Sequence, residues 1–306
     1  MKLASLTDVG RKRGHNEDNL LASSIAVVEA GWKQPFHLCV VADGMGGAAA
    51  GEVASEMTTA IVARGIFSAI VESQSDRDRG FINCAKTIKE SIERANKQVY
   101  FTARSSHIYA GMGSTCCLGL VSGGLLTVGH VGDSRCYLFR RGRLRQLTRD
   151  HSFVNELVRE GRITEEQAAK HPRRNVITRA IGSREDVSVD VLEHLVEAGD
   201  LLLFCSDGLS GMIGDAEIAS ILRKDLGKVI CEEGLEQLCR TLINQANEAG
   251  GKDNISVVIA GVEHSDIPPR LMRPIPIRPN SVLSWEEAYE EGFVDDSFVP
   301  VENERS

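Results

Sequence analysis

Apolar runs that stop at an aspartate are the feature that most constrains how this 306-residue chain can fold. Short apolar runs are typical of buried strands, and a carboxylate at the end of a strand sits on a rigid mount. A fourth aspartate lies just before a strand-like run. The runs and their aspartates are 38–42 with Asp43, 125–132 with Asp133, 201–206 with Asp207, and 255–262 with Asp253. This pattern predicts a β core and suggests a metal site.

The order of the remaining patterns predicts an α+β domain. Two segments with apolar residues at helical spacing, 51–70 and 81–104, follow the first strands, and two more, 215–222 and 235–247, precede the last. The predicted strands are 3–9, 20–28, 38–42, 113–121, 125–131, 135–140, 143–147, 187–192, 200–206 and 255–262. Since β and α runs do not alternate regularly, an antiparallel β core covered by helices on its outer faces is expected.

Glycine-containing turns separate the four strands predicted between residues 113 and 147. Short β-type runs joined in this way are typical of an antiparallel meander. A further turn is predicted at residues 30–35.

Two segments are expected outside the core. Residues 149–179 carry two short helical patterns, 153–159 and 164–170, and are interpreted as a mobile insertion. Residues 264–306 contain six of the eight prolines and nine acidic against four basic residues. This composition predicts a linker and an acidic, disordered tail, with a docking or autoregulatory segment as the alternative.

Charge and composition restrict the partners. A formal net charge of -8 argues against a protein that binds nucleic acid or an anionic membrane. Neither a membrane-spanning run nor a signal-peptide pattern is evident, so a cytoplasmic location is expected. The eight cysteines include no CxxC pair, which predicts reduced, mostly buried thiols.

The aspartates at strand ends favour a particular metal chemistry. Oxygen-only ligand sets suit Mg²⁺ or Mn²⁺ rather than zinc. Three carboxylates packed together without cations would raise one another's pKa, which is costly. A single aspartate at a strand end is more often a turn former, but the repeated pattern of Asp43, Asp207 and Asp253 indicates a shared site.

Seven short motifs, taken together, resemble those of a known family. They match, in order, the metal-dependent protein serine/threonine phosphatases of the PPM (type 2C) family in its bacterial form. The motifs begin with Arg13-Gly14-His15-Asn16-Glu17-Asp18, Val41-Ala42-Asp43-Gly44-Met45-Gly46-Gly47 and Gly51-Glu52, and continue with Gly113-Ser114-Thr115, His130-Val131-Gly132-Asp133-Ser134-Arg135, Cys205-Ser206-Asp207-Gly208-Leu209 and Lys252-Asp253-Asn254-Ile255-Ser256.

The resemblance implies a domain over residues 1–263 and a tail over 264–306. The domain is expected to be a four-layer α-β-β-α sandwich, in which two antiparallel sheets are flanked by helix pairs. The insertion then corresponds to a flap, at about 149–181, beside a two-metal cleft.

The resemblance also implies roles for individual residues. Asp43 is expected to bridge two Mn²⁺ or Mg²⁺ ions, with Asp207 and Asp253 completing one site and Glu17 and the Gly44 carbonyl serving the other. A third, weaker metal is expected at Asp133 and Asp207, with Asn175 as a further contributor. Asp18 would orient metal-bound water, and Arg13 would bind phosphate oxygens. The flap residues Arg173 and Arg174 are candidate substrate-binding groups.

The activity implied is hydrolysis of phosphoserine and phosphothreonine in proteins, without a phosphoenzyme. A hydroxide that bridges the metals would attack in line. The expected partners are phosphoprotein substrates and a Ser/Thr kinase whose action the enzyme opposes. The protein is expected to be a monomer. Many eukaryotic relatives have a histidine, proposed as the general acid, where this chain has Met45. Methionine cannot donate a proton, so the group that protonates the leaving group is unassigned, and His15 is a weak candidate.

Other classes of protein fit the sequence less well. Residues 44–49 fit a GxGxxA dinucleotide fingerprint, but the preceding Asp43 would repel a pyrophosphate and the βαβ pattern is missing. The glycines are not followed by the GK[ST] of a P-loop, and no cysteine has an arginine six positions later, as a cysteine phosphatase requires. A catalytically silent, metal-binding scaffold of the same fold remains the alternative.

Overall fold

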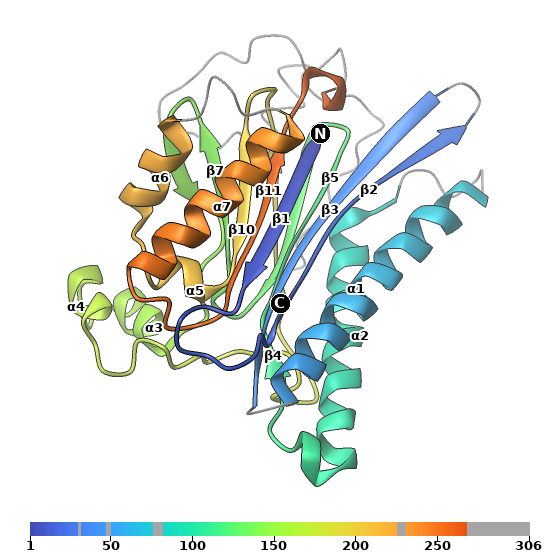
Figure 1. The fold of residues 1–306 in the computed structure, drawn as a ribbon. Helices are drawn as coiled ribbons and strands as arrows, with labels where there is room; N and C mark the ends of the chain where they lie inside the picture. Colours follow the sequence, from blue (N-terminus) through green and yellow to red (C-terminus); the bar gives the residue numbers. More distant parts are fainter. Residues whose placement is uncertain (30–31, 47–49, 76–81, 225–230, 268–306) are drawn as a thin grey trace.

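Two antiparallel sheets packed face to face form the centre of the molecule, of which the computed structural model describes residues 1–29, 32–46, 50–75, 82–224 and 231–267 (Figure 1). In the first sheet the strand order is β1-β11-β10-β7-β8, and in the second it is β2-β3-β5-β6-β9, with β4 paired to β3. The strands are β1 Lys2–Asp8, β2 Asp18–Glu29, β3 Trp32–Met45, β4 Gly113–Ser114, β5 Cys116–Ser122, β6 Leu125–Val131, β7 Arg135–Arg140, β8 Arg143–Gln146, β9 Asp190–Leu195, β10 Leu201–Cys205 and β11 Ile255–Gly261.

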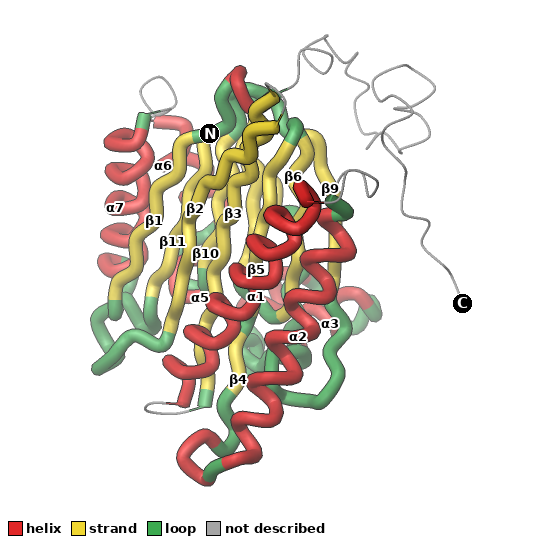
Figure 2. Tube along the Cα trace, turned by 90° about the vertical axis from the view of Figure 1, so that its right-hand side faces the viewer, coloured by secondary structure: helices red, strands yellow, loops and turns green. Residues whose placement is uncertain are grey.

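Helices cover the outer face of each sheet. Helices α1 and α2 lie on the second sheet, and α6 and α7 lie on the first, as two views at right angles show (Figures 1 and 2). The helices are α1 Ala50–Ser75, α2 Cys84–Ser105, α3 Phe153–Arg159, α4 Glu165–Ala169, α5 Asp207–Ser210, α6 Asp215–Lys224 and α7 Glu232–Glu248, with 3-10 turns η1 His107–Tyr109 and η2 His264–Asp266. The predicted four-layer α-β-β-α sandwich is therefore confirmed.

Strand β10 shows why the apolar runs are continuous. Its successive side chains point to opposite faces of the sheet, and both faces are buried. Leu203 packs among the residues beneath α6 and α7, whereas Leu202 and Phe204 pack between the sheets. Because helices cover one face and the second sheet covers the other, every residue of this strand is buried.

The flap helices begin as their sequences predict. Ser152 caps α3, since its side chain accepts a hydrogen bond from the Asn155 amide. Thr164 and Gln167 form a reciprocal capping box at the start of α4. The observed bounds of α3 match the predicted range 153–159.

The predicted continuous meander is wrong. Strands β5 and β6 pair in one sheet, and β7 and β8 pair in the other. Residues 132–134 therefore cross between the sheets instead of closing a hairpin. At Gly132, which has φ +114°, an added Cβ would lie 2.6 Å from the Thr115 side chain, so the crossing needs glycine for its space as well as its backbone angle.

Three boundaries also differ from expectation. The turn predicted at 30–35 is wrong for its second half, because β3 begins at Trp32 and Pro35 pairs with Ala26. Asp43 is not at the end of its strand, since Gly44 and Met45 extend β3 by pairing with β4. The strand predicted at 187–192 is shifted to Asp190–Leu195. The predicted tail beyond residue 267 lies outside the described residues.

Among the described residues, one helix, α1, is long and apolar enough by length and composition to cross a membrane. Core helices of globular proteins pass the same test. The apolar residues of α1 pack against β3 and α2, including Val62, Ile66 and Ile70, which are fully buried.

Candidate active site

Asp43 lies at the centre of a group of carboxylates. The antiparallel register places Asp18 of β2 directly opposite Asp43 of β3, so their side chains lie on the same side of the sheet. Thr115 fixes the Asp43 backbone: its hydroxyl accepts a hydrogen bond from the Asp43 amide at 2.9 Å, and its amide donates to the Asp43 carbonyl at 2.8 Å. The position of Asp43 is thus set by backbone pairing on both sides.

Asp207 and Asp253 approach from the other sheet. Asp207 is the first residue of α5, directly after β10, and Asp253 lies just before β11. These two strands are neighbours. An added Cβ at Gly208 would collide with the carbonyl oxygen of Asn254, so the glycine allows the two loops to touch.

Glu17 is held by contacts to its backbone. Its amide donates to the Asn254 side chain at 2.8 Å, and its carbonyl accepts from the Ser55 hydroxyl at 2.6 Å and from the Gly44 amide at 3.1 Å. The side chain passes over Gly51, where an added Cβ would collide with Oε2. Glu17 and Gly44, predicted to serve one metal, are therefore adjacent.

Burial and mutual repulsion raise the pKa values of these carboxyl groups. Burial is the main cause for Asp43, whose pKa lies well above its usual range, and Asp18, Asp207, Asp133 and Asp253 raise it further. The pKa of Asp18 is raised to about 7 by burial, although Ser206 donates a hydrogen bond to its Oδ2 at 2.8 Å.

Asp133 and Asp207 have the least satisfied side chains of the group. Each has a buried Oδ1 atom without a hydrogen-bond partner. Burial and the nearby Asp207 raise the pKa of Asp133 to about 8, and burial and Asp253 raise that of Asp207. Buried, unpaired carboxylate oxygens are costly unless a proton or a cation neutralises them.

The carboxylates are gathered but not arranged as a coordination shell. Within the ranges that the structure describes, no three His, Cys, Asp or Glu side chains are placed so that they could hold a metal ion as they stand. Metal binding would therefore require these side chains to rotate within the cluster.

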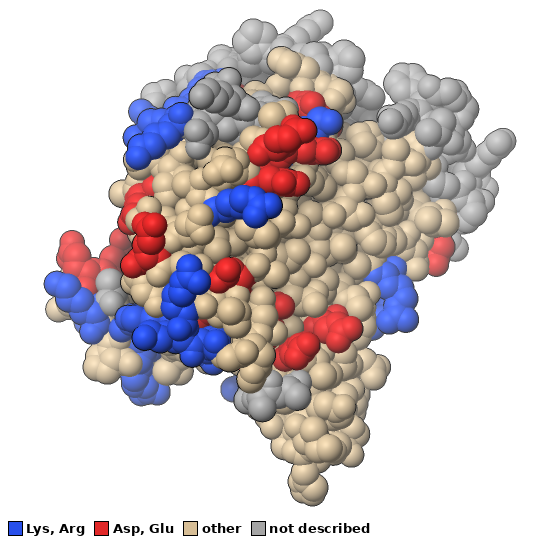
Figure 3. Space-filling model, viewed as in Figure 1, with Lys and Arg blue, Asp and Glu red and all other residues tan. Residues whose placement is uncertain are grey.

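Arg13 lies at the mouth of the cluster. Its Nη2 donates to Oδ2 of Asp253 at 2.7 Å, and the side chain is half exposed. The hydrogen bond to Asp253 raises the pKa of Arg13, and the negative charges of Glu17 and Asp43 raise it further. Residues 11–13 are all basic and exposed, and Figure 3 shows basic side chains gathered over the loop that follows β1. His15, half exposed, lies 3.3 Å from Glu17.

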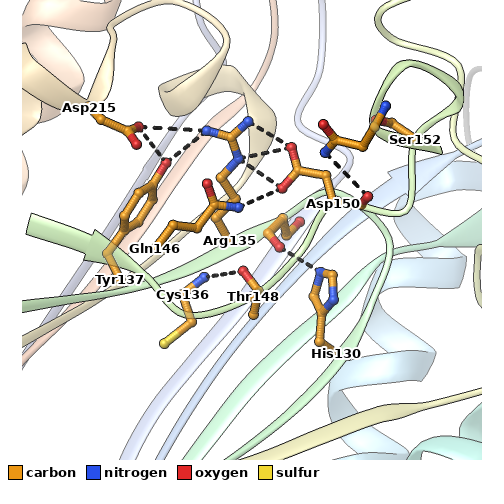
Figure 4. A network of polar contacts seen from close by, with 11 residues as sticks. His130, Arg135, Cys136, Tyr137, Gln146, Thr148, Asp150, Ser152 and Asp215 are labelled. Atoms are coloured by element: carbon orange, nitrogen blue, oxygen red, sulfur yellow. Dashed lines mark hydrogen bonds and ion pairs between the residues drawn. The ribbon is translucent and has the colours of Figure 1, made fainter. Parts of the chain in front are cut away.

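A polar network supports the loop that carries Asp133 (Figure 4). Arg135 donates through both Nε and Nη2 to the carboxylate of Asp150, and through Nη1 to the Tyr137 hydroxyl, which in turn donates to Asp215. His130 contacts the Ser134 carbonyl at 2.9 Å. These contacts hold the residues on both sides of Asp133.

Among the described residues, the predicted flap residues make no hydrogen bond or ion pair with the carboxylates of the cluster. Arg173 stacks over Phe153, with its guanidinium carbon 4.2 Å from the ring centroid, and Arg174 and Asn175 are exposed. Among the described residues, Asn175 makes no hydrogen bond to Asp133 or to Asp207. The flap roles thus stay predictions.

Sequence reasoning missed residues that hold the carboxylates. Ser206 bonds to Asp18, Thr115 to Asp43, and Asn254 to Glu17. All three belong to the quoted motifs, but a hydroxyl or amide beside an aspartate gave no sign of which distant group it would contact.

Comparisons with known proteins agree with this architecture. A model of the protein phosphatase 2C family matches residues 15–256. The chain is 38% identical over 257 residues to the serine/threonine phosphatase stp of Listeria innocua, covering 83% of this chain and 92% of that protein. The crystal structure of the Mycobacterium tuberculosis serine/threonine phosphatase PstP/Ppp superimposes with a TM-score of 0.71 at 35% identity, covering 86% of this chain and 99% of that one. A PstP catalytic domain in complex with two manganese ions gives a TM-score of 0.67 at 34% identity, covering 86% and 98%.

Fold and site define a protein phosphatase built on an α-β-β-α sandwich with an acidic cluster at one end. Within that class, the chain belongs to the protein phosphatase 2C family. The predicted family and enzyme class are thereby confirmed.

Proposed function

We propose that this chain hydrolyses phosphoserine and phosphothreonine in proteins, using two divalent cations, Mn²⁺ or Mg²⁺. One observation carries the proposal: the carboxylates of Asp43, Asp133 and Asp207 converge, with raised pKa values and two buried oxygens that lack partners. Cations of this kind prefer oxygen ligands and would satisfy those oxygens. The two manganese ions bound by a PstP catalytic domain support the same assignment.

The donor set fits the predicted roles. Asp43 would hold both cations, Asp207 and Asp253 one of them, and Glu17 with the Gly44 carbonyl the other. Their positions agree with this division, because Asp207 and Asp253 come from adjacent loops and Glu17 lies beside Gly44. A third cation at Asp133 and Asp207 is part of the proposal.

When bound, the cations lower the pKa of the attacking water and neutralise charge on the phosphoryl group. Arg13 grips phosphate oxygens at the mouth of the site, where its guanidinium already lies against Asp253. Asp18, fixed by Ser206, accepts a proton or hydrogen bond from water at the cluster. Met45 supplies no proton, so the leaving group takes its proton from water or from His15.

The cellular setting belongs to the same proposal. The enzyme would act as a monomer in the cytoplasm, where it would oppose a Ser/Thr kinase. The resemblance of the motifs to those of protein serine/threonine phosphatases supports the opposition to a kinase.

Turnover of p-nitrophenyl phosphate with Mn²⁺, with and without EDTA, tests the activity. The wild-type protein is expected to turn over the substrate only with the metal. Asp43→Asn should lower kcat by at least about 100-fold, the usual effect of removing a key catalytic group, while the far-UV circular dichroism stays unchanged. A folded protein that binds Mn²⁺ but has no turnover would instead support the silent-scaffold alternative.

A further inference from the structure

A groove lies beside the candidate active site, because Met45, close to Asp43 in the sequence, lines it. It has a volume of about 530 Å³. The end of α2, the turn after η1, and Ala180, Gly182 and Ser183, where the flap returns to the core, line it. Met45, two residues after Asp43, also lines the groove, and its side chain lies close to Gly113.

The lining of this groove is almost entirely uncharged. Its walls and floor are built from two methionines, several small residues and one arginine, including Met45, Met112, Ala103, Ala110, Ala180 and Arg104. Methionine side chains are flexible and polarizable, so they adapt to apolar groups of different shapes. Ile108, 75% exposed and two residues before Ala110, extends the apolar surface beyond the groove.

Figure 3 shows one face of the lower tip of the molecule. The described residues at the lower tip of the molecule, around the end of α2, show no charged side chain there. The charged groups of this face lie elsewhere, including the basic group over the loop after β1.

We propose that this groove binds an apolar side chain of the phosphoprotein substrate, two or three residues from the phosphorylated serine or threonine. The inference rests on the proposed function, which places the phosphate at Asp43. Met45 is two residues beyond Asp43 in β3, and an extended peptide advances about 3.3 Å per residue. A peptide that runs alongside β3 would therefore place a residue two or three positions from the phosphate next to Met45.

Arg104 sets what the groove rejects. Its guanidinium stacks over the Tyr100 ring, with the central carbon 3.7 Å from the centroid, and the residue is exposed at the groove. A lysine or arginine in the substrate would meet this fixed positive charge without a partner. Repulsion of this kind adds to specificity by excluding competitors.

The experiment uses phosphothreonine peptides that differ at one position, with leucine, alanine or lysine placed up to three residues on either side. For wild type with Mn²⁺, leucine at one position two or three residues away should raise kcat/KM by about 5- to 10-fold over alanine, a typical return for filling an apolar pocket. Lysine at that position should lower it.

Two variants fill the groove from two different segments that line it, Ala110→Phe and Ser183→Phe. Both positions are exposed, so folding should be retained. Each should reduce the leucine preference to less than about two-fold and leave turnover of p-nitrophenyl phosphate, which is too small to reach the groove, unchanged. Ala216→Phe, at an exposed alanine on α6, is the matched control and should keep the preference. Arg104→Glu should reverse the penalty for lysine.

The outcomes separate this inference from the proposed function. Loss of Mn²⁺-dependent turnover of p-nitrophenyl phosphate in wild type would overturn the function itself. Normal turnover with a leucine preference that survives in both filled variants would overturn the groove assignment alone. If both filled variants were more active than wild type on all peptides, the groove would instead hold an inhibitory segment of this same chain. That result would also overturn the groove assignment.

Discussion

Asn254 holds two distant parts of the chain together through its side chain. Its Nδ2 donates to the carbonyls of Val9 and His15 at 3.0 Å, and its Oδ1 accepts from the Glu17 amide, 237 positions away in the sequence. Its own amide donates to Asp253. One side chain therefore sets the distance between two predicted metal ligands.

The difference between Asp253 and Asn254 shows what sequence could predict at this scale. Aspartates beside apolar runs suggest metal chemistry because few other roles explain a repeated carboxylate at strand ends. An asparagine in a loop is commonly a turn residue, and its partners become evident only when the first and last strands are side by side.

Arg13→Ala is expected to raise KM for phosphopeptides by about 10-fold and to change kcat little. A hydrogen bond to a charged group contributes about 1.5–3 kcal/mol, and the half exposure of Arg13 favours the lower end. Steady-state kinetics measure KM and kcat. Mn²⁺ is kept at a saturating concentration, so that a change in metal affinity at Asp253, which loses its contact with Arg13, does not affect the result.

Lys12→Ala is the matched control, because Lys12 is basic and exposed in the same loop. Its KM should equal that of wild type. Equal KM values for Arg13→Ala and wild type would remove the phosphate-binding role of Arg13.

At the scale of elements, most helices and strands follow from their periodicity, but the assignment of strands to sheets does not. The turns at 123–124 and 132–134 both contain glycine, yet the first closes a hairpin and the second crosses between sheets. The distinction depends on packing. The Gly132 backbone lies against Thr115, and the polar network of Arg135 holds β7 over Asp150. No local pattern encodes these contacts.

Gly208→Ala tests the contact between the loops that carry Asp207 and Asp253. Its φ is ordinary, so the expected effect comes from the collision of the new Cβ with Asn254. Overpacking of this kind costs about 1–3 kcal/mol, and separating the loops should lower the affinity for Mn²⁺. Thermal unfolding and a calorimetric Mn²⁺ titration measure the two effects.

Gly214→Ala provides the control, since a Cβ added at this position would have no atom within 4 Å and its φ is also ordinary. Both its unfolding temperature and its affinity for Mn²⁺ should match those of wild type. If Gly208→Ala behaves in the same way, the close approach of the loops does not determine the site.

At the scale of the whole molecule, the carboxylate cluster links stability to pH. In the metal-free protein the pKa values of Asp18 and Asp133 are raised to about 7 and about 8, chiefly by burial. Groups whose pKa is raised on folding bind more protons in the folded state, so their contribution to stability is lost as pH rises through the folded pKa.

We therefore expect the unfolding temperature in EDTA to fall between pH 6.5 and 8.5. Burial lowers the pKa of His130 to about 3 and that of His194 to about 4. Because these histidines bind fewer protons in the folded state, they make stability rise with pH below pH 6.5, and the window avoids that range. With Mn²⁺ the unfolding temperature should change less over this pH range, because bound cations replace the protons on the carboxylates. Asp133→Asn should reduce the slope in EDTA, and a slope equal to that of wild type would contradict the raised pKa.

The pairing of β1 with β11 has a consequence for synthesis. Lys2 lies opposite Gly261, and Asp8 opposite Ile255, so the first strand has its neighbour in the sheet only after almost the whole described domain has been made. At about 5–20 residues per second, that interval lasts tens of seconds. During this time β1 lacks its partner edge, and Glu17 and Asp43 lack Asp253. A ribosome-bound chain is thus expected to be catalytically inert until its last strand emerges.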